Sequence, residues 1–216
     1  MEPGSAAVAE VARIVIGVAD AVPIQWSLQT LGGGVTEDIG ASGGIRRVAG
    51  TAQHLGRTIE WPVIVKALLR QEVVVGDYRP VRNDPRAFDY WRREADVYDS
   101  GLLAALGGGL LAPRCFRIDD HGDEMLLWLE DVPDDGPSEW SFDQYRPAVF
   151  HLGQLNGLYL DGRPLPFQPW LSRGRIREWL AAGRGSIERM RVQRRPGPPV
   201  DVAQRCFRRR NRAPPG

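Results

Sequence analysis

The chain has 216 residues, enough for one ordinary domain or two small lobes, and its 43% hydrophobic content is that of a globular protein. The formal net charge of +1 conceals an uneven distribution. Residues 1–190 hold 20 basic and 26 acidic residues, whereas residues 191–216 hold eight arginines and a single aspartate. The near-neutral total therefore combines a mildly acidic body with a strongly basic tail.

Only two cysteines are present, Cys115 and Cys206. They are too few for a disulfide framework and lack the spacing of a metal site, so we expect a cytoplasmic protein. Arg13 and Asp20 interrupt the first apolar stretch, and no apolar stretch is long enough to cross a bilayer. We therefore expect neither an export signal nor a membrane partner.

The first elements predict a helix followed by a glycine-rich hairpin. Residues 5–21 have apolar positions three and four apart, which favours an N-terminal helix within residues 1–22. Residues 24–31 alternate apolar and polar side chains, which is typical of a half-buried strand, and run into Gly32, Gly33 and Gly34. A second glycine cluster precedes a returning strand at residues 45–49, and we expect residues 50–58 to form turns.

Lys66 is the only lysine in the sequence and lies in the predicted strand 59–69. The neighbouring residues are β-branched and aliphatic, which indicates a strand buried on at least one face. A lysine here suits a phosphate contact. The alternative is an incidental edge lysine whose ammonium group reaches solvent.

A long helix is predicted next. Asp84 and Pro85 are typical of a helix start, and the following apolar residues form one stripe, ended by Gly107, Gly108 and Gly109. The stripe consists of Phe88, Trp91, Ala95, Tyr98 and Leu102. Glu94 lies at its border, where a carboxylate can face a neighbouring sheet or simply lie on the helix surface.

The remaining elements are a hairpin and a helical region. Residues 113–119 and 124–130 predict two strands, the second central because it is apolar throughout. An acidic linker at 133–140 separates the lobe at 23–132 from predicted helices at 140–160 and 170–180, within a partial helical lobe at 141–190. Residues 191–216 are rich in arginine and proline, and we expect a disordered tail.

This order of elements resembles the N-terminal lobe of the protein-kinase-like fold. More narrowly, it resembles the bacterial phosphotransferase family that includes aminoglycoside phosphotransferases and choline-kinase-like proteins. The resemblance spans roughly residues 24–180, and the fold class expected from it is α+β, with about five antiparallel strands and one long helix before an incomplete helical lobe. The stretches that carry it are Val63-Ile-Val-Lys-Ala-Leu, Tyr90-Trp-Arg-Arg-Glu-Ala, Leu111-Ala-Pro-Arg-Cys-Phe, Leu126-Leu-Trp-Leu-Glu-Asp-Val, His151-Leu-Gly-Gln-Leu-Asn-Gly and Pro169-Trp-Leu-Ser-Arg-Gly.

The resemblance implies an ATP-dependent phosphotransferase that acts on a small-molecule hydroxyl. Lys66 would contact the ATP phosphates and form an ion pair with Glu94. Gly32, Gly33 and Gly34 would belong to the loop that covers the nucleotide, although the Gly-x-Gly-x-x-Gly spacing is absent. Leu129 would lie at the back of the adenine pocket, and the backbones of Glu130 and Val132 would bind the adenine.

The sequence departs from the family in its catalytic residues. Phosphoryl transfer in this fold uses an aspartate, an asparagine five residues later, and a further aspartate for Mg²⁺. His121-Gly122-Asp123 has the right letters, but Trp128 stands five residues after Asp123, and a hairpin turn explains the triplet better. No match follows Leu180. We therefore expect a truncated, catalytically deficient form without Mg²⁺ ligands, and we hypothesise that residues from about 191 are translated out of frame.

Two alternatives to an active enzyme stay open. The first is a nucleotide-binding remnant that keeps Lys66 and the adenine pocket. The second is an interaction module that uses the arginine-rich tail, although Phe207 is the only aromatic residue there, so we do not expect a nucleic-acid partner. In either case, we expect apolar residues of the partial helical lobe to be exposed, including Leu155, Leu158 and Trp179, and the stability to be marginal.

Overall fold

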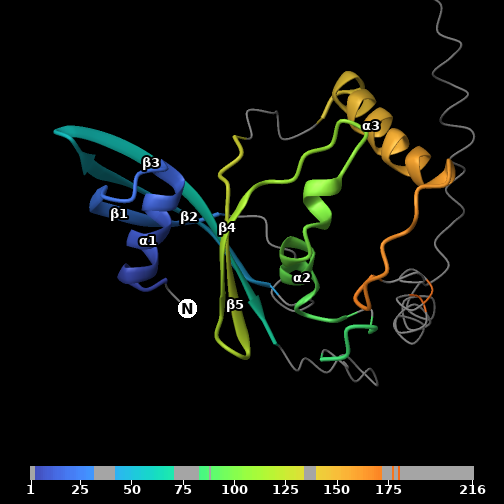
Figure 1. The fold of residues 1–216 in the computed structure, drawn as a ribbon, viewed down its shortest axis with the longest axis horizontal. Coiled ribbons are helices and arrows are strands. Elements are labelled where there is room, and N and C mark those ends of the chain that lie inside the picture. The colour runs from blue at the N-terminus through green and yellow to red at the C-terminus, as the bar shows by residue number, and fades with distance from the viewer. Residues whose placement is uncertain are drawn as a thin grey trace, which may run out of the picture. The chain divides into compact units, whose positions relative to one another are not determined.

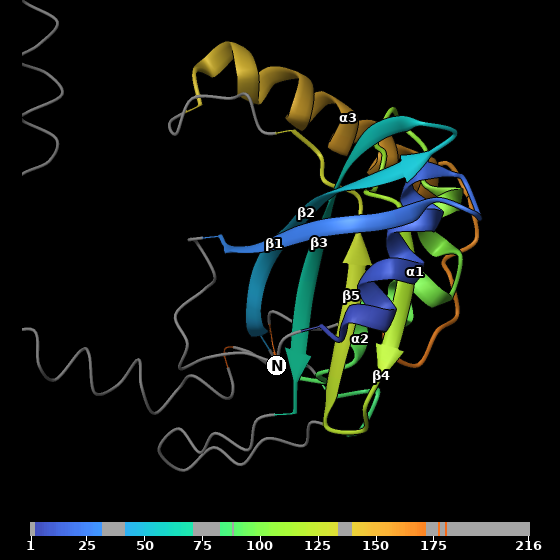
Figure 2. The same cartoon turned by 90° about the vertical axis from the view of Figure 1, so that its left-hand side faces the viewer.

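Five antiparallel strands form one sheet in the order β1-β2-β3-β5-β4. The structure is a computed structural model that describes residues 3–31, 42–70, 83–87, 89–133, 140–171, 177 and 180. Figure 1 shows the arrangement, and Figure 2 shows β5 between β3 and β4. The strands are β1 (Val22–Thr30), β2 (Ser42–His54), β3 (Arg57–Leu69), β4 (Cys115–Asp120) and β5 (Glu124–Leu129).

Three α-helices accompany the sheet within the described residues: α1 (Ser5–Ile16), α2 (Arg93–Asp99) and α3 (Phe142–Leu160). A short 3₁₀ helix, η1 (Leu102–Ala105), follows α2. The predicted α+β class with a five-stranded antiparallel sheet is confirmed, as is the central position of the apolar strand β5.

The chain divides into two compact units. The first comprises Met1–Val74 and Arg79–Arg173 and holds all the elements named above. The second comprises Val75–Tyr78 and Gly174–Gly216, of which the structure describes only Arg177 and Leu180, both in helical backbone. The predicted helix at 170–180, the tail at 191–216 and Trp179 therefore lie outside the described residues, apart from residues 170, 171, 177 and 180.

The sheet has two apolar faces, because alternate side chains of a strand point to opposite sides. Helix α1 covers one face, and α2 lies on the other (Figure 1). The buried residues on the α1 side are Val8, Val11, Ala12, Ala21, Val48, Ala52, Trp61, Val63, Val65, Ala67, Leu126 and Trp128. Those on the α2 side are Leu68, Trp91, Ala95, Met125, Leu127 and Leu129.

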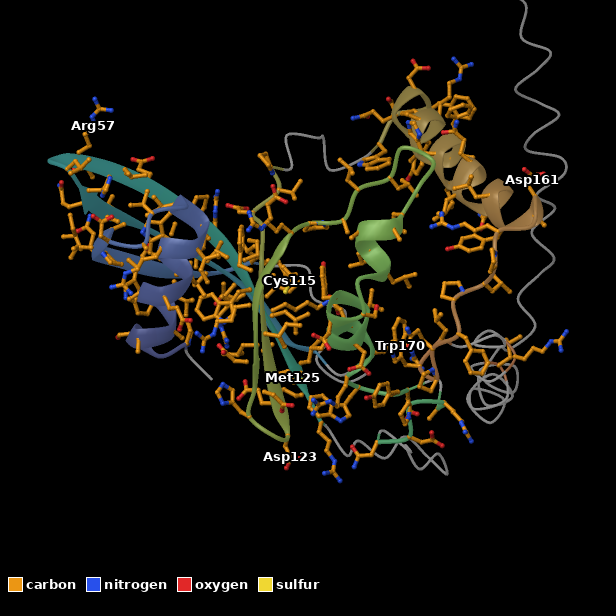
Figure 3. The ribbon with its side chains drawn as sticks, in the orientation of Figure 1. Arg57, Cys115, Asp123, Met125, Asp161 and Trp170 are labelled. Atoms are coloured by element: carbon orange, nitrogen blue, oxygen red, sulfur yellow. The ribbon has the colours of Figure 1, made fainter. Side chains whose placement is uncertain are left out.

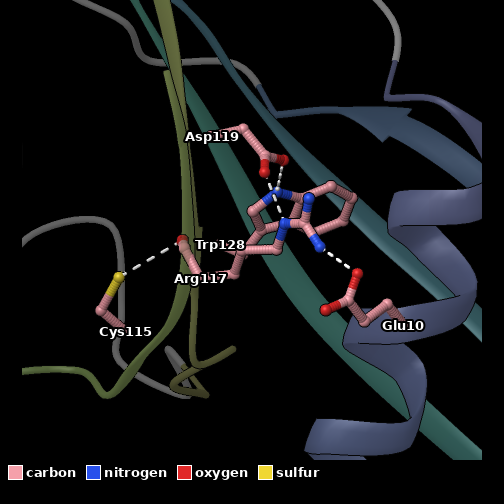
Figure 4. Close-up of polar contacts among 5 residues, drawn as sticks. All are labelled: Glu10, Cys115, Arg117, Asp119 and Trp128. Atoms are coloured by element: carbon pink, nitrogen blue, oxygen red, sulfur yellow. Dashed lines mark hydrogen bonds and ion pairs between the residues drawn. The ribbon is translucent and has the colours of Figure 1, made fainter.

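Polar side chains close the edge of the α1 face, as Figure 4 shows. The indole Nε1 of Trp128, which is fully buried, donates a hydrogen bond to Oδ2 of Asp119 at 2.8 Å. Arg117 bonds Oδ1 of the same carboxylate at 2.5 Å and also pairs with Glu10 of α1. The buried indole N–H is thereby satisfied, and α1 is joined to β4 by an ion pair.

The hairpin between β2 and β3 is longer than predicted. Residues 50–54 and 57–58 continue the two strands, and the turn consists of Leu55 and Gly56 alone, which have φ values of 46° and 74°. Two positive φ values in succession are typical of the tight turns that match strand twist. The prediction of turns over residues 50–58 is wrong, because Gly50 is a strand residue.

The prediction of a long helix after Asp84 is also wrong, since α2 spans only seven residues. Oδ1 of Asp84 accepts a hydrogen bond from the backbone N–H of Arg86 at 2.9 Å, which holds residues 84–86 in a local turn. Gly101, with a φ of 71°, follows the helix end. Trp91 and Ala95 of the predicted stripe are nevertheless buried, whereas Phe88 lies outside the described residues.

Gly107, Gly108 and Gly109 follow η1 instead of ending a long helix, and they allow α3 to approach. A Cβ on Gly108 would lie 2.7 Å from the backbone nitrogen of Leu155, and one on Gly109 would lie 2.4 Å from Nδ1 of His151. That His151 nitrogen is 2.7 Å from the carbonyl oxygen of Gly108.

Helix α3 confirms the predicted helix at 140–160, with Ser141 and Gln144 forming a reciprocal capping box. None of its residues is buried, and Leu158 is exposed as predicted, whereas Leu155 is half-buried. No helix in the described part of the chain is long and apolar enough to cross a membrane.

Gly50→Ala should destabilise the sheet. A Cβ at this position would lie 2.3 Å from the carbonyl oxygen of Gln25 and 2.8 Å from Cζ2 of Trp61, so a backbone group would have to move. We expect a loss of about 1–3 kcal/mol in the free energy of urea unfolding.

Gly153→Ala is the matched control, because a Cβ there meets nothing within 4 Å in helix α3. This change should leave stability unaltered or raise it by up to about 1 kcal/mol. Equal stability of the two variants would contradict the close approach of the β1 backbone to Gly50.

Candidate functional site

The α2 face of the sheet carries one lysine among apolar residues. Lys66 lies near the end of β3, directly opposite Ile45 of β2 and Leu127 of β5. Its Nζ donates a hydrogen bond of 2.6 Å to Oε2 of Glu94 on α2. The two residues that the sequence proposed for a phosphate site are thus in direct contact across the space between sheet and helix.

The ion pair is partly shielded from solvent. The side chains of Lys66 and Glu94 are 25% and 36% exposed, whereas Leu127, beside Lys66 on the neighbouring strand β5, is fully buried. An ammonium group over apolar side chains loses hydration, and the carboxylate replaces part of it. Because both charges retain some contact with water, the pair adds little to folding stability.

Helix α2 is held in place from both sides, which fixes Glu94. Ala95 and the preceding Trp91 pack on the sheet with Met125 and Leu127. On the far side, Nε of Arg93 donates a 2.7 Å hydrogen bond to the carbonyl of Trp170, which lies in the segment after α3 (Figure 3). The carboxylate therefore projects from a helix that contacts two other parts of the chain.

Two weak acids near the pair are held neutral. Burial, followed by the negative charge of Glu94, raises the pKa of Tyr98. Burial also raises the pKa of the Cys115 thiol, against a smaller lowering by its contact with the Arg117 backbone. Both groups are therefore uncharged near neutral pH, and the charges near them are those of the Lys66–Glu94 pair.

The residues proposed for the adenine end lie at the end of β5. Leu129 is buried in the apolar layer of the α2 face, and Val132 is exposed. The backbone N–H of Glu130 donates to the carbonyl of Arg114 at 2.8 Å, and its carboxylate accepts from the Arg114 N–H at 3.0 Å. Only the Glu130 carbonyl is then left for a ligand among its backbone groups.

A second charge pair on this face was not predicted. Arg47 lies opposite Ile64, which lies opposite Leu129, so these residues form the row next to that of Lys66. Nη2 of Arg47 is 2.5 Å from Oδ2 of Asp131, the residue between Glu130 and Val132. The only signals in the sequence were the position of Asp131 inside the Glu-Asp-Val stretch and an arginine in a predicted strand.

The glycine cluster and the His-Gly-Asp triplet singled out in the sequence do not add to this site. Gly32, Gly33 and Gly34 lie outside the described residues. His121, Gly122 and Asp123 form the predicted turn between β4 and β5, where Gly122 has a φ of 86°. Within the described ranges, no three His, Cys, Asp or Glu side chains gather as metal ligands.

Comparisons of the chain with protein-family models, with curated proteins and with solved structures found no match.

The free energy of unfolding of a Glu94→Gln variant separates a structural role of the Lys66–Glu94 pair from a ligand-binding role. Because the pair is partly exposed, we expect this change to lower the free energy of unfolding by no more than about 1 kcal/mol. Leu127→Ala, which empties the apolar layer beside the same pair, should cost about 2–5 kcal/mol. Similar losses in both variants would make the ion pair a structural support.

Proposed function

We propose that the α2 face of the sheet binds the phosphates of a nucleoside triphosphate through Lys66, as a kinase-like nucleotide-binding lobe. The observation that carries this proposal is the 2.6 Å contact between Lys66 on β3 and Glu94 on α2. It joins the sole lysine of the chain to a carboxylate 28 residues away, on a different element.

The ammonium group of Lys66 has N–H donors beyond the one that bonds Glu94. A lysine carries three N–H donors, and Glu94 accepts from one of them, so the others can bond phosphate oxygens. Glu94 also holds Nζ in one place before the ligand arrives, which reduces the conformational entropy lost on binding. A partly exposed ion pair that adds little stability is better explained by such a role than by folding.

ATP and a small-molecule hydroxyl acceptor are the ligands that the phosphotransferase resemblance suggests. The sequence lacks the aspartate and asparagine spacing of the catalytic loop, so we propose binding of the nucleotide without efficient transfer. Loss of a general base alone lowers rates by about 100- to 10,000-fold. The alternative of a basic-tailed interaction module concerns residues outside the described part of the chain.

The single lysine makes a direct test possible. Lys66 and the N-terminus supply the only amines that an amine-reactive acetylating reagent can modify, and mass spectrometry separates the two peptides and distinguishes them from any modified tyrosine or cysteine. With ATP or GTP present at about ten times its dissociation constant, acetylation of Lys66 should slow by about tenfold, whereas the N-terminal amine should react at an unchanged rate. Equal rates at Lys66 with and without nucleotide would contradict the proposal.

Nucleotide affinities of variants should also identify Lys66 as the phosphate ligand. Lys66→Met should abolish nucleotide binding measured by calorimetry. Arg70→Met, which removes a charge just after the same strand, should leave the affinity nearly unchanged. An equal loss in both variants would assign the binding to overall charge instead of to Lys66.

A further inference from the structure

The Arg47–Asp131 pair lies on the same face as Lys66 but at the opposite side of the proposed nucleotide. Ile64 belongs to one row and Lys66 to the next. The two residues are two positions apart on β3, so the rows are about 6.6 Å apart along the strand. A ligand whose phosphates contact Lys66 can therefore extend its base over Ile64 and Leu129, toward Asp131.

Asp131 has unused hydrogen-bonding capacity. Its side chain is 12% exposed, and its Oδ2 is buried yet accepts no hydrogen bond from the residues that the structure describes. The Arg47 guanidinium, 2.5 Å away, makes an ion pair with this oxygen without hydrogen-bond alignment. Arg47 is 45% exposed, so part of its guanidinium is open to a ligand.

We propose that this pair selects guanine, so that the preferred ligand of the site is GTP rather than ATP. The inference rests on the proposed function and specifies its base. Guanine presents two neighbouring donors, N1–H and the N2 amino group, which fit the two oxygens of the Asp131 carboxylate. Its O6 and N7 are acceptors, and an arginine guanidinium is their usual partner.

Adenine fits the same groups less well. It offers the carboxylate one amino donor at N6 and places the lone pair of N1 beside the second oxygen, where two acceptors repel each other. The backbone N–H of Glu130, which could have donated to N1, already bonds the carbonyl of Arg114. Adenine would leave one carboxylate oxygen without a partner, and such unpaired groups discriminate strongly.

The first experiment compares nucleotides on the unmodified chain by calorimetry. GTP should bind about tenfold more tightly than ATP, the size of effect that one bidentate base contact gives. ITP, which lacks the N2 amino group and is otherwise identical to GTP, should bind about fivefold more weakly than GTP. This comparison needs no variant and therefore does not depend on the folding of any.

The second experiment changes Asp131, the residue proposed to contact the base. Asp131→Asn replaces one acceptor by a donor, which is the pattern that suits the N1 and N6 edge of adenine. The preference for GTP should fall to about unity or reverse, chiefly through loss of GTP affinity. Asp123→Asn, which breaks the exposed 3.1 Å pair with Arg70 on the far hairpin, is the matched control and should keep the tenfold ratio.

The outcomes separate the inference from the proposed function. If ATP binds as tightly as GTP, or if ITP equals GTP, the guanine assignment fails while nucleotide binding stands. If Asp131→Asn keeps the wild-type ratio of GTP to ATP affinity, and circular dichroism shows that the variant is folded, Asp131 does not select the base and the assignment is overturned. If no nucleotide binds the unmodified chain, both the proposed function and the assignment fail.

Discussion

A charged ammonium group on a strand with two apolar faces is the constraint on which the arrangement depends. Lys66 lies between Ile45 and Leu127, so its ammonium group is only partly hydrated and gains from a carboxylate on an element packed on this face. Helix α2 supplies Glu94, and the apolar contacts of Trp91 and Ala95 hold that helix against the sheet. The position of α2 and the state of the lysine are therefore coupled.

The two faces of the sheet serve different purposes. On the α1 face, apolar packing is sealed at its edge by Arg117, Asp119 and Trp128, which bond one another and Glu10 (Figure 4). On the α2 face, the charges form two pairs that retain acceptor or donor capacity.

Local patterns predicted the sheet well and the helix after Asp84 poorly. The strands followed from alternation and from the apolar run of β5, which depend only on neighbouring residues. The length of α2 was overestimated because an apolar stripe also arises when the chain turns, and the bond from Arg86 to Asp84 is a local contact that periodicity does not detect. The extent of β2 was missed because the glycine at position 50 is explained by the close approach of Gln25 and Trp61, contacts that are distant in sequence.

The candidate site was predicted in part for the same reason. The composition drew attention to Lys66 and the apolar stripe to Glu94, but their pairing was predicted only from the resemblance to the kinase-like fold. Arg47 and Asp131 meet only through the registers of β2 with β3 and of β3 with β5, which no single stretch encodes. Such contacts between distant strands are where the sequence alone is least informative.

The measurement that tests the central claim most directly uses the single lysine as a probe. Lysine labelled with ¹³C at Cε gives one Cε–H cross-peak for the whole chain, because Lys66 is the only lysine. Bound phosphates next to Nζ should shift this peak progressively during a GTP titration, and the shift should saturate. A peak that stays in place across the whole titration, while the chain remains folded, would contradict the assignment of Lys66 to a nucleotide phosphate.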